Sequence, residues 1–258
     1  MKKVLSVVLS VIMLLSVVPI TASAETYSGA CGENATWAFD DATGILTISG
    51  TGAMRNYGFE NRSPWRSYEE MIKEVIVSDC ITTIGEMAFM GCYNLTSVII
   101  SDSVTSIGNS AFAYCSSLTS VIIGNGVTTI SGNAFFNCNS LTGVTIPDSV
   151  TTIGYCAFKG CESLASVTVP DSVTSIDYSA FDNTTYYNDL NNWENDVLYI
   201  GKHLMEAKTT LSGDYAIKDG TITIVAFAFM GCDKLTSITI PDSITTIGNT
   251  ACYDCDGL

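Results

Sequence analysis

A 23-residue repeat is the feature that most constrains what this chain can fold into. The stretch Leu95–Ser117 reads LTSVIISDSVTSIGNSAFAYCSS, and contiguous copies of the same length follow it. With looser copies included, the other repeats begin at Ile72, Leu118, Leu141, Leu164, Ser212 and Leu235. A fixed period of about 20 to 50 residues is typical of a solenoid, in which each repeat packs on its neighbours. The repeat therefore predicts a solenoid.

The first part of each repeat has the alternation of a short strand. In the repeat that begins at Leu95, Val98 and Ile100 are expected to point into the core, whereas Ser97 and Ile99 are expected to point outward. Equivalent strands of successive repeats are expected to lie about 4.8 Å apart in a parallel sheet.

The rest of each repeat is expected to supply two further sides. A turn at Asp102 leads into a second extended segment, in which Val104 and Ile107 point inward. The Ala-Phe-x-x-Cys segment, here Ala111–Cys115, predicts about one helical turn or a short 3₁₀ segment that closes the layer. The predicted fold class is therefore an α/β repeat solenoid.

The spacing of the cysteines favours core packing over disulfides for most of them. The chain has 10 cysteines, which in an exported protein suggests a disulfide framework. Six of the cysteines occupy one repeat position and so form a column: Cys92, Cys115, Cys138, Cys161, Cys232 and Cys255. Because buried free cysteine behaves as a small hydrophobic group, this column is better explained by unpaired core packing than by disulfides. A disulfide between two of the others is left open: Cys31, Cys80, Cys156 and Cys252.

The N-terminal residues have the pattern of a signal peptide. A basic start at Lys2-Lys3 precedes an apolar run over residues 4–18, and Ala-Ser-Ala at 22–24 provides a small-residue cleavage site. We therefore expect residues 1–24 to be removed, and the mature chain to be exported and to have no membrane span. An uncleaved anchor is the alternative.

The charge of the mature chain limits its partners. Two of the 11 basic residues lie in the signal peptide, which leaves nine against 26 acidic residues, a net charge of −17. Such a surface repels phosphate backbones and anionic lipid, so no nucleic-acid partner is expected. Basic partners, divalent cations and neutral glycans remain open, and the acidity also favours solubility.

Residues 25–71 do not follow the repeat and are expected to form an N-terminal cap. ATWAFDD and ILTISG, joined by Ala-Thr-Gly at 42–44, predict a β-hairpin. SYEEMIKE predicts a short helix with Ser67 as its N-cap. Because the open end of a solenoid exposes apolar side chains, Trp37 and Trp65 are expected to cover it. Ligand stacking is the alternative for these tryptophans.

The pattern degenerates at about 186–213, within the repeat region that extends over residues 72–258. Val197–Ile200 and His203–Ala207 indicate two strands joined by Gly-Lys as a two-residue hairpin turn. The equivalent isoleucines on either side of the insert, Ile176 and Ile224, are two positions further apart than two whole repeats would place them. We interpret the insert as a modified repeat that projects a hairpin, and not as a domain boundary.

The repeat pattern LTSVTIPDSVTSIGNSAFxGC resembles the BspA-like leucine-rich repeats, the 23-residue class of treponemal and Bacteroides surface proteins. The stretch GACGENATWAFDDATGILTISGTGAM and the SPW segment also resemble the cap that precedes such repeats in secreted clostridial proteins. The resemblance implies a right-handed leucine-rich-repeat superhelix with a parallel β-sheet on its concave face. It also implies export and, for some members, adhesion to host matrix proteins or to other bacteria.

This resemblance supplies no catalytic residues. The chain departs from the family pattern at the insert, at Cys252 and at its end. Because no C-terminal cap follows the last repeat, the chain is expected to be truncated at Leu258.

Few residues suggest catalysis or metal binding. His203 is the single histidine, and it is expected on the surface of the hairpin with no matched nucleophile nearby. Cys252-x-x-Cys255 resembles a redox or zinc pair, but core packing is preferred because no second pair with zinc spacing follows. We therefore expect no catalytic residues, no metal site and no cofactor.

An aspartate column recurs at one turn position. Aspartate favours turns by its own local hydrogen bonding, whereas calcium bridging between layers is the alternative, although no repeat supplies the several oxygens that calcium prefers. With Asn125 interrupting the row, the column consists of Asp79, Asp102, Asp148, Asp171, Asp219 and Asp242.

The outward strand positions are the predicted working surface. They form a small, flat, hydroxyl-rich face with an apolar patch, which suits an extended peptide or a glycan. The alternative is that these residue types simply favour strands. The candidate binding residues are Ser97, Ile99, Ser120, Ile122, Thr145, Thr168 and Thr239, together with Trp193 of the insert, because aromatic side chains suit sugar or protein contacts. Packing of the insert onto the solenoid is the alternative for Trp193.

These observations together predict a secreted or cell-surface, non-catalytic module that binds a protein or a glycan on host matrix or on another bacterial surface. One alternative is a scaffold or accessory region of a larger secreted protein, for example a carbohydrate-degrading one, with its catalytic or docking module beyond residue 258. A passive structural spacer is the other.

Overall fold

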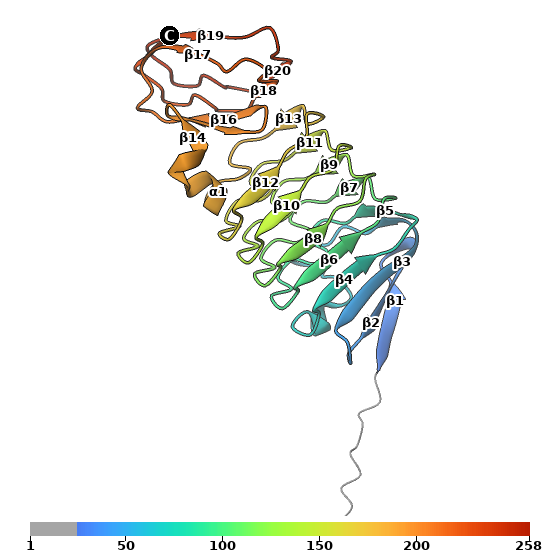
Figure 1. The fold of residues 1–258 in the computed structure, drawn as a ribbon. Coiled ribbons are helices and arrows are strands. Elements are labelled where there is room, and N and C mark those ends of the chain that lie inside the picture. The colour runs from blue at the N-terminus through green and yellow to red at the C-terminus, as the bar shows by residue number, and fades with distance from the viewer. Residues whose placement is uncertain (1–24) are drawn as a thin grey trace, which may run out of the picture.

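The computed structural model describes residues 25–258, so the predicted signal peptide lies outside the described residues. Within this range the chain winds into a stack of similar turns, whose strands form parallel ladders from one turn to the next (Figure 1). The predicted repeat solenoid is confirmed. No helix of the described part is both long and apolar enough to cross a membrane.

One side of the stack is a row of parallel strands, which we call the first sheet. Residues pair with their equivalents one repeat further on, so that Val75 lies opposite Val98. The predicted alternation is confirmed, because Val98 is buried whereas Ile99 is 37% exposed. The strands of this sheet are β4 (Glu74–Val77), β6 (Ser97–Ile100), β8 (Ser120–Ile122), β10 (Gly143–Thr145), β12 (Ser166–Thr168), β17 (Gly213–Ala216) and β19 (Leu235–Thr239).

A second side, the second sheet, is formed by shorter strands. Ile84, Ile107 and Ile130 are aligned across neighbouring strands and are fully buried. The strands are β5 (Ile81–Ile84), β7 (Ser106–Ile107), β9 (Thr129–Ile130), β11 (Thr152–Ile153), β13 (Ser175–Ile176), β18 (Thr223–Ile224) and β20 (Thr246–Ile247).

The third side consists of isolated turns and not of regular helix. Ala111 N–H donates to Gly108 O at 3.2 Å, which is the single turn expected there. The turn does not continue as a helix, because Ser110 has a φ of 54° and because Phe112 N–H donates to Ala134 O of the next layer at 2.8 Å. The described helices are correspondingly short: η1 (Arg66–Tyr68), α1 (Thr185–Asn188) and η2 (Leu190–Asn192).

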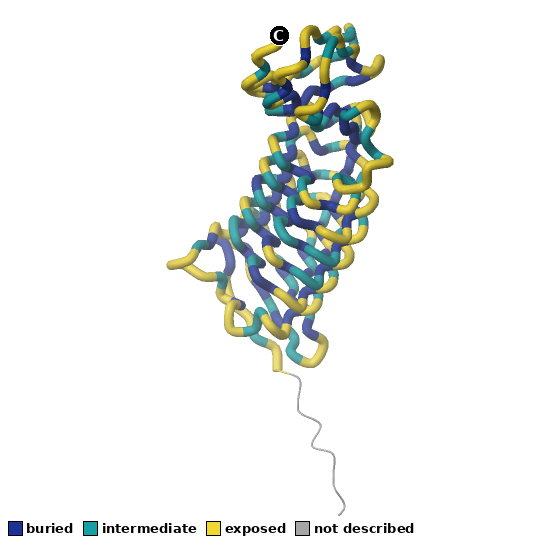
Figure 2. Tube along the Cα trace, turned by 90° about the vertical axis from the view of Figure 1, so that its left-hand side faces the viewer, coloured by how far each residue is buried: buried dark blue, intermediate teal, exposed yellow. Residues whose placement is uncertain are grey.

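The core is a stack of aromatic rings enclosed by the three sides. Buried positions line the inside of the stack along its whole length, and exposed positions lie on the outer turns (Figure 2). Successive ring centroids lie 5.1–5.3 Å apart with nearly parallel planes. The stack contains Trp65, Phe89, Phe112, Phe135, Phe158 and Phe181.

The predicted ladder of unpaired cysteines is confirmed. All ten cysteines are free. Cys115 Sγ lies 3.2 Å from Phe89 O, and Cys138 Sγ lies 3.2 Å from Phe112 O, so each thiol donates to a carbonyl of the preceding layer. The four off-column cysteines, for which the sequence allows a disulfide, are also unpaired, and among them Cys31 is buried whereas Cys80 is exposed.

The cap contains the predicted hairpin and one further strand. β2 (Gly32–Asp40) and β3 (Ile45–Met54) pair in antiparallel fashion, and β1 (Thr26–Ala30), which was not predicted, adds to β2. β3 pairs with β4 at one end and with β5 at the other, so a single strand begins both sheets. The cap therefore fixes where both sheets begin.

The predicted helix after the hairpin is wrong in extent and in its N-cap. Only η1 forms, its N-cap is Trp65 and not Ser67, and no side chain caps it. The reason is that Trp65 is fully buried, with its ring on Phe89 and its Nε1 donating to Ala88 O at 2.9 Å. Trp37 is also buried, as expected for a residue of the cap.

The insert contains the predicted hairpin, but the hairpin does not project. After β14 (Trp193–Glu194), β15 (Val197–Ile200) and β16 (His203–Ala207) pair in antiparallel fashion. All four residues of β15 are buried, and β16 pairs in parallel with β18, so the hairpin forms part of a layer. Across residues 25–258 no strand pairing joins β13 to β16 or β12 to β17, yet the buried core continues through this junction.

Candidate functional site

The apolar part of the predicted surface lies on β6 and β8. Ser97 lies opposite Ser120, and Ile99 lies opposite Ile122. Ile122 is 58% exposed and Ile99 37%, whereas Ser97 is half-buried and Ser120 is exposed. These four predicted residues therefore form one contiguous patch on the first sheet.

The hydroxyl-rich part of the predicted surface is divided by the insert. Thr145 and Thr168 are exposed and lie opposite each other on β10 and β12. Thr239 is also exposed, but it lies on β19, opposite Ala216 and beyond the break in the first sheet. The structure thus brings Thr145 and Thr168 together but leaves Thr239 apart from them.

A groove of about 580 Å³ crosses the first sheet where β8 meets β10. These two strands are not paired, whereas the second sheet continues without interruption at the same layers. Hydroxyl, amide and apolar groups line the groove: Ser120, Ile122, Asn125, Thr145, Pro147, Ser166 and Thr168. We call it the sheet groove.

Pro147 lies beside the interruption but does not by itself cause it, because Pro170 holds the equivalent position in the next layer, where β10 and β12 remain paired. In an earlier repeat, Ser101 at the equivalent position donates its N–H to Val77 O at 3.2 Å. Proline has no N–H, so this bond to the preceding strand is lost. The groove also lies beside Gly143, which places no side chain on the face.

Trp193 does not belong to this surface. It is half-buried in the insert, where its Nε1 donates to Tyr187 O at 2.8 Å and its ring lies 5.5 Å from the Tyr187 ring. Lys208 Nζ lies 4.7 Å from the centre of the indole ring. Trp193 therefore packs the insert together.

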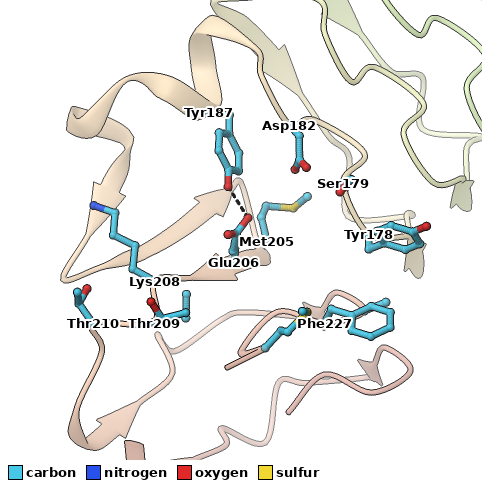
Figure 3. Close-up of a pocket in the computed structure, with 13 residues that line it drawn as sticks. Tyr178, Ser179, Asp182, Tyr187, Met205, Glu206, Lys208, Thr209, Thr210 and Phe227 are labelled. Atoms are coloured by element: carbon cyan, nitrogen blue, oxygen red, sulfur yellow. Dashed lines mark hydrogen bonds between the residues drawn. The ribbon is translucent and has the colours of Figure 1, made fainter. Parts of the chain in front are cut away.

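A larger cleft, of about 750 Å³, lies on the third side at the insert (Figure 3). Its origin is a shortened layer. Leu204 lies opposite Ile224, and Leu211 closes the same kind of turn as Leu235. Leu235 follows Ile224 by eleven positions, but Leu211 follows Leu204 by only seven. The insert layer therefore lacks part of its third side, and the two flanking layers wall the space. We call this space the junction cleft.

The junction cleft combines carboxylates with aromatic and thioether groups. Tyr187 Oη donates to Glu206 Oε2 at 2.6 Å, and the Tyr178 and Phe227 rings lie edge to face with centroids 5.6 Å apart (Figure 3). The side chains that line the cleft come from three layers, among them Tyr178 and Asp182 before the insert, Met205 and Glu206 on β16, and Phe227 and Met230 after it.

Burial controls the electrostatics of this cleft. It raises the pKa of the Glu206 carboxyl, and the charge of nearby Asp182 adds to this effect, whereas the hydrogen bond from Tyr187 opposes it. Burial and the same hydrogen bond raise the pKa of Tyr187. Tyr187 therefore remains a hydrogen-bond donor at neutral pH.

Reasoning from sequence identified the insert but missed the cleft. The total spacing from Ile176 to Ile224 was visible, yet it is longer than two repeats and gives no sign of a missing turn. The short spacing from Leu204 to Leu211 indicates the missing turn. It can be interpreted only when Leu204 is known to be the equivalent of Ile224, which the strand pairing shows.

The expectation of a surface histidine is wrong. His203 is fully buried, because β16 lies inside a layer. Its Nε2 lies 3.2 Å from Pro170 O, and its Nδ1 has no partner. Burial lowers the pKa of His203, so the ring is neutral near pH 7.

The expected core packing of the Cys252-x-x-Cys255 pair is correct for Cys255 alone. Cys255 Sγ lies 2.9 Å from Phe229 O, as in the rest of the cysteine ladder. Cys252 is exposed, because it lies in the outermost described layer of the stack. Asp102 Oδ1 accepts the Asn125 N–H at 2.7 Å, which links the turns of two layers. No group of three or more His, Cys, Asp or Glu side chains in the described range is placed to hold a metal ion.

Comparisons with known proteins agree with this architecture. The family described as BspA type leucine rich repeat region matches residues 67–188 and 200–258 in six copies. No curated protein matches the chain. A leucine-rich repeat protein from Eubacterium ventriosum is 31% identical, with a TM-score of 0.60, and the match covers 89% of this chain. This chain spans 63% of the length of that protein.

Two further solved structures are similar. A leucine rich cell surface protein from Faecalibacterium prausnitzii is 25% identical, and the match covers 92% of this chain and 76% of that one, with a TM-score of 0.48. A leucine-rich repeat protein of T. pallidum is 21% identical over 86% of both chains, also with a TM-score of 0.48. The family match covers well over half of the residues of this chain. The chain therefore belongs to the BspA type leucine-rich repeat family.

Proposed function

We propose that this chain is an exported, non-catalytic binding module that holds a protein or glycan ligand in the sheet groove. The observation that supports this best is that the groove coincides with Ile122, Thr145 and Thr168, which the sequence predicts to bind. Hydroxyl groups both donate and accept hydrogen bonds, and Ile122 offers apolar contact. Such a lining suits an extended peptide or an oligosaccharide.

The absence of catalysis is part of the proposal. The single histidine is buried against a backbone carbonyl, so it has no nucleophile to activate. The ligand is expected on host matrix or on another bacterial surface, and export is expected to follow removal of residues 1–24. N-terminal sequencing of the secreted protein tests export, with Glu25 as the expected first residue.

Groove-filling variants test the binding site. Thr145→Arg and Thr168→Arg place a large cation in the groove, whereas Thr239→Arg makes the same change at an exposed position beyond the sheet break. The wild-type protein is first assayed on a glycan array and on immobilised matrix proteins. We expect the two groove variants to lose binding of any ligand that the wild-type protein binds, and Thr239→Arg to retain it. Equal binding by all four proteins, or no ligand in either assay, contradicts the proposal.

The second candidate is a scaffold or accessory region of a longer secreted protein. It is favoured by the fact that the chain spans 63% of the Eubacterium ventriosum protein. In that case the groove variants would bind as the wild type does, and an enzymatic or docking module encoded beyond residue 258 would account for the activity.

A further inference from the structure

Glu206 presents an uncompensated charge to the junction cleft. The ion pairs of residues 25–258 do not include it. The neighbouring cations are engaged elsewhere, since Lys159 pairs with Asp182 at 3.3 Å and Lys208 pairs with Asp196 at 3.6 Å. Tyr187 satisfies one oxygen of Glu206 but brings no charge. A cationic partner stabilises the ionised form of a half-buried carboxylate of this kind.

Aromatic and thioether groups flank this carboxylate. Tyr178 is 46% exposed and Phe227 is half-buried, and the two rings meet at the wall of the cleft that lies across from Tyr187 (Figure 3). The faces of aromatic rings attract cations, and apolar groups contact the methylene chains of long basic side chains. Met230, 52% exposed, extends the same wall.

We propose that the junction cleft binds an arginine or lysine side chain of a basic peptide segment. Glu206 pairs with the cationic head, and Tyr178 and Phe227 contact its stem and its charge. A volume of about 750 Å³ accommodates more than one side chain, so neighbouring peptide residues lie along the cleft as well. The net charge of −15 favours the approach of a basic partner over an acidic or neutral one.

This site is separate from the sheet groove. The cleft lies on the third side at the insert, whereas the groove lies on the first sheet, and the two share no lining residue. A test of one therefore leaves the other untouched.

Methionine methyl NMR provides a local readout. Met205 and Met230 line the cleft, whereas Met90 holds the same repeat position as Met230 in an earlier layer and does not line it. The probe is hexa-arginine amide, and its matched control is hexa-citrulline amide, which has a similar shape and no side-chain charge. We expect hexa-arginine to shift the methyl signals of Met205 and Met230 but not that of Met90, and hexa-citrulline to shift none.

Two variants identify the charge that binds. Glu206→Gln keeps the shape and an oxygen for Tyr187, and it is expected to raise the Kd for hexa-arginine by about tenfold or more. Glu33→Gln makes the same change of net charge at an exposed cap residue and is expected to leave the Kd unchanged. Tyr178→Ser removes an exposed ring, and a loss of roughly two- to fivefold is expected. The unperturbed Met90 signal verifies folding in each variant.

Three outcomes overturn the proposal. Equal Kd values for Glu206→Gln and Glu33→Gln mean that only the overall charge attracts the peptide. Shifts at Met205 and Met230 with chitohexaose or cellohexaose, and none with hexa-arginine, mean that the cleft is a glycan site. No shift with any probe means that the cleft binds neither. Thr145→Arg is expected to bind hexa-arginine as the wild type does, which separates this result from that of the sheet groove.

Discussion

Tyr187 donates a 2.6 Å hydrogen bond to Glu206 and thereby links α1 to β16 at the end of the junction cleft. The bond favours the ionised form of the carboxyl, whereas burial favours the neutral form. Burial dominates, because the pKa of Glu206 is raised. The two effects are separable, since the hydroxyl can be removed without changing the size of the side chain appreciably.

Tyr187→Phe is expected to raise the pKa of Glu206 further. The substitution removes the donor that stabilises the carboxylate and leaves the burial as it is. A ¹³C NMR titration of the Glu206 carboxyl carbon measures the change. Tyr186→Phe is the control, because the Tyr186 hydroxyl donates to Tyr199 O and not to Glu206. A pKa that falls or stays constant in Tyr187→Phe contradicts the assignment.

The aromatic stack is expected to be the main source of local stability. Phe135 is fully buried, with Phe112 at 5.3 Å and Phe158 at 5.2 Å on its two sides. Phe135→Ala is expected to lower the free energy of unfolding by about 3–5 kcal/mol. Urea denaturation followed by tryptophan fluorescence measures this change.

The control for the stack is Phe59→Ala. Phe59 is 67% exposed, so its removal is expected to change the free energy of unfolding by less than about 0.5 kcal/mol. Similar losses for Phe59→Ala and Phe135→Ala would mean that the stacked column does not carry the stability.

The periodic part of the fold can be predicted from the sequence because equivalent residues of successive repeats pack in the same way. The position of Phe112 holds a phenylalanine in each of the contiguous layers from Phe89 to Phe181, and only stacking buries all of these rings at once. The exposed face follows from the period of two along each strand, which is why Ile122 and Thr145 were placed correctly.

The places where the structure departs from the regular repeat cannot be predicted from the sequence in the same way. The sheet groove requires that β8 and β10 separate, and Pro147 by itself does not reveal this, since Pro170 occupies the equivalent position in a layer where β10 and β12 remain paired. The junction cleft depends on the path of β16, which in turn depends on the pairing of Leu204 with Ile224. His203 was placed on the surface for the same reason, because a hairpin pattern does not say which layer buries it.

Thiol reactivity is expected to divide the cysteines by position. Burial raises the pKa of Cys92 to about 12 and that of Cys115 well above its ordinary value, so these thiols stay protonated and inaccessible at pH 8. Cys80 and Cys252 are exposed. Burial and the neighbouring Cys255 raise the pKa of Cys252, which slows its reaction relative to that of an unperturbed thiol. We nevertheless expect Cys80 and Cys252 to be labelled by a thiol-disulfide reagent in the native protein before any other cysteine, and the buried ladder cysteines to be labelled only in urea.

The double variant Cys80→Ala and Cys252→Ala is expected to lose the fast phase of labelling. Mass spectrometry of the labelled peptides assigns each site. Fast reaction of Cys115 in the native protein would show that the third side opens readily, contrary to its packing.

Stability below neutral pH is expected to depend on His203. Its pKa in the folded protein is lowered by burial, while in the unfolded chain it is about 6.5. Between these two values the unfolded chain binds more protons, so the free energy of unfolding falls as the pH drops below about 6.5 and levels off below the folded pKa. The groups that face the ring act in opposite directions: Pro170 O and the charge of Asp171 raise the pKa, and Lys202 lowers it.

Two variants test this origin of the pH dependence. His203→Gln keeps a donor for Pro170 O and does not titrate, so its free energy of unfolding is expected to vary less between pH 7 and pH 5 than that of the wild type. Asp171→Asn removes a charge that raises the pKa of His203, so a steeper dependence is expected. Urea titrations at a series of pH values give the three slopes. If His203→Gln has the slope of the wild type, the dependence arises from the carboxylates, because the acidic side chains are then the remaining groups that titrate in this range.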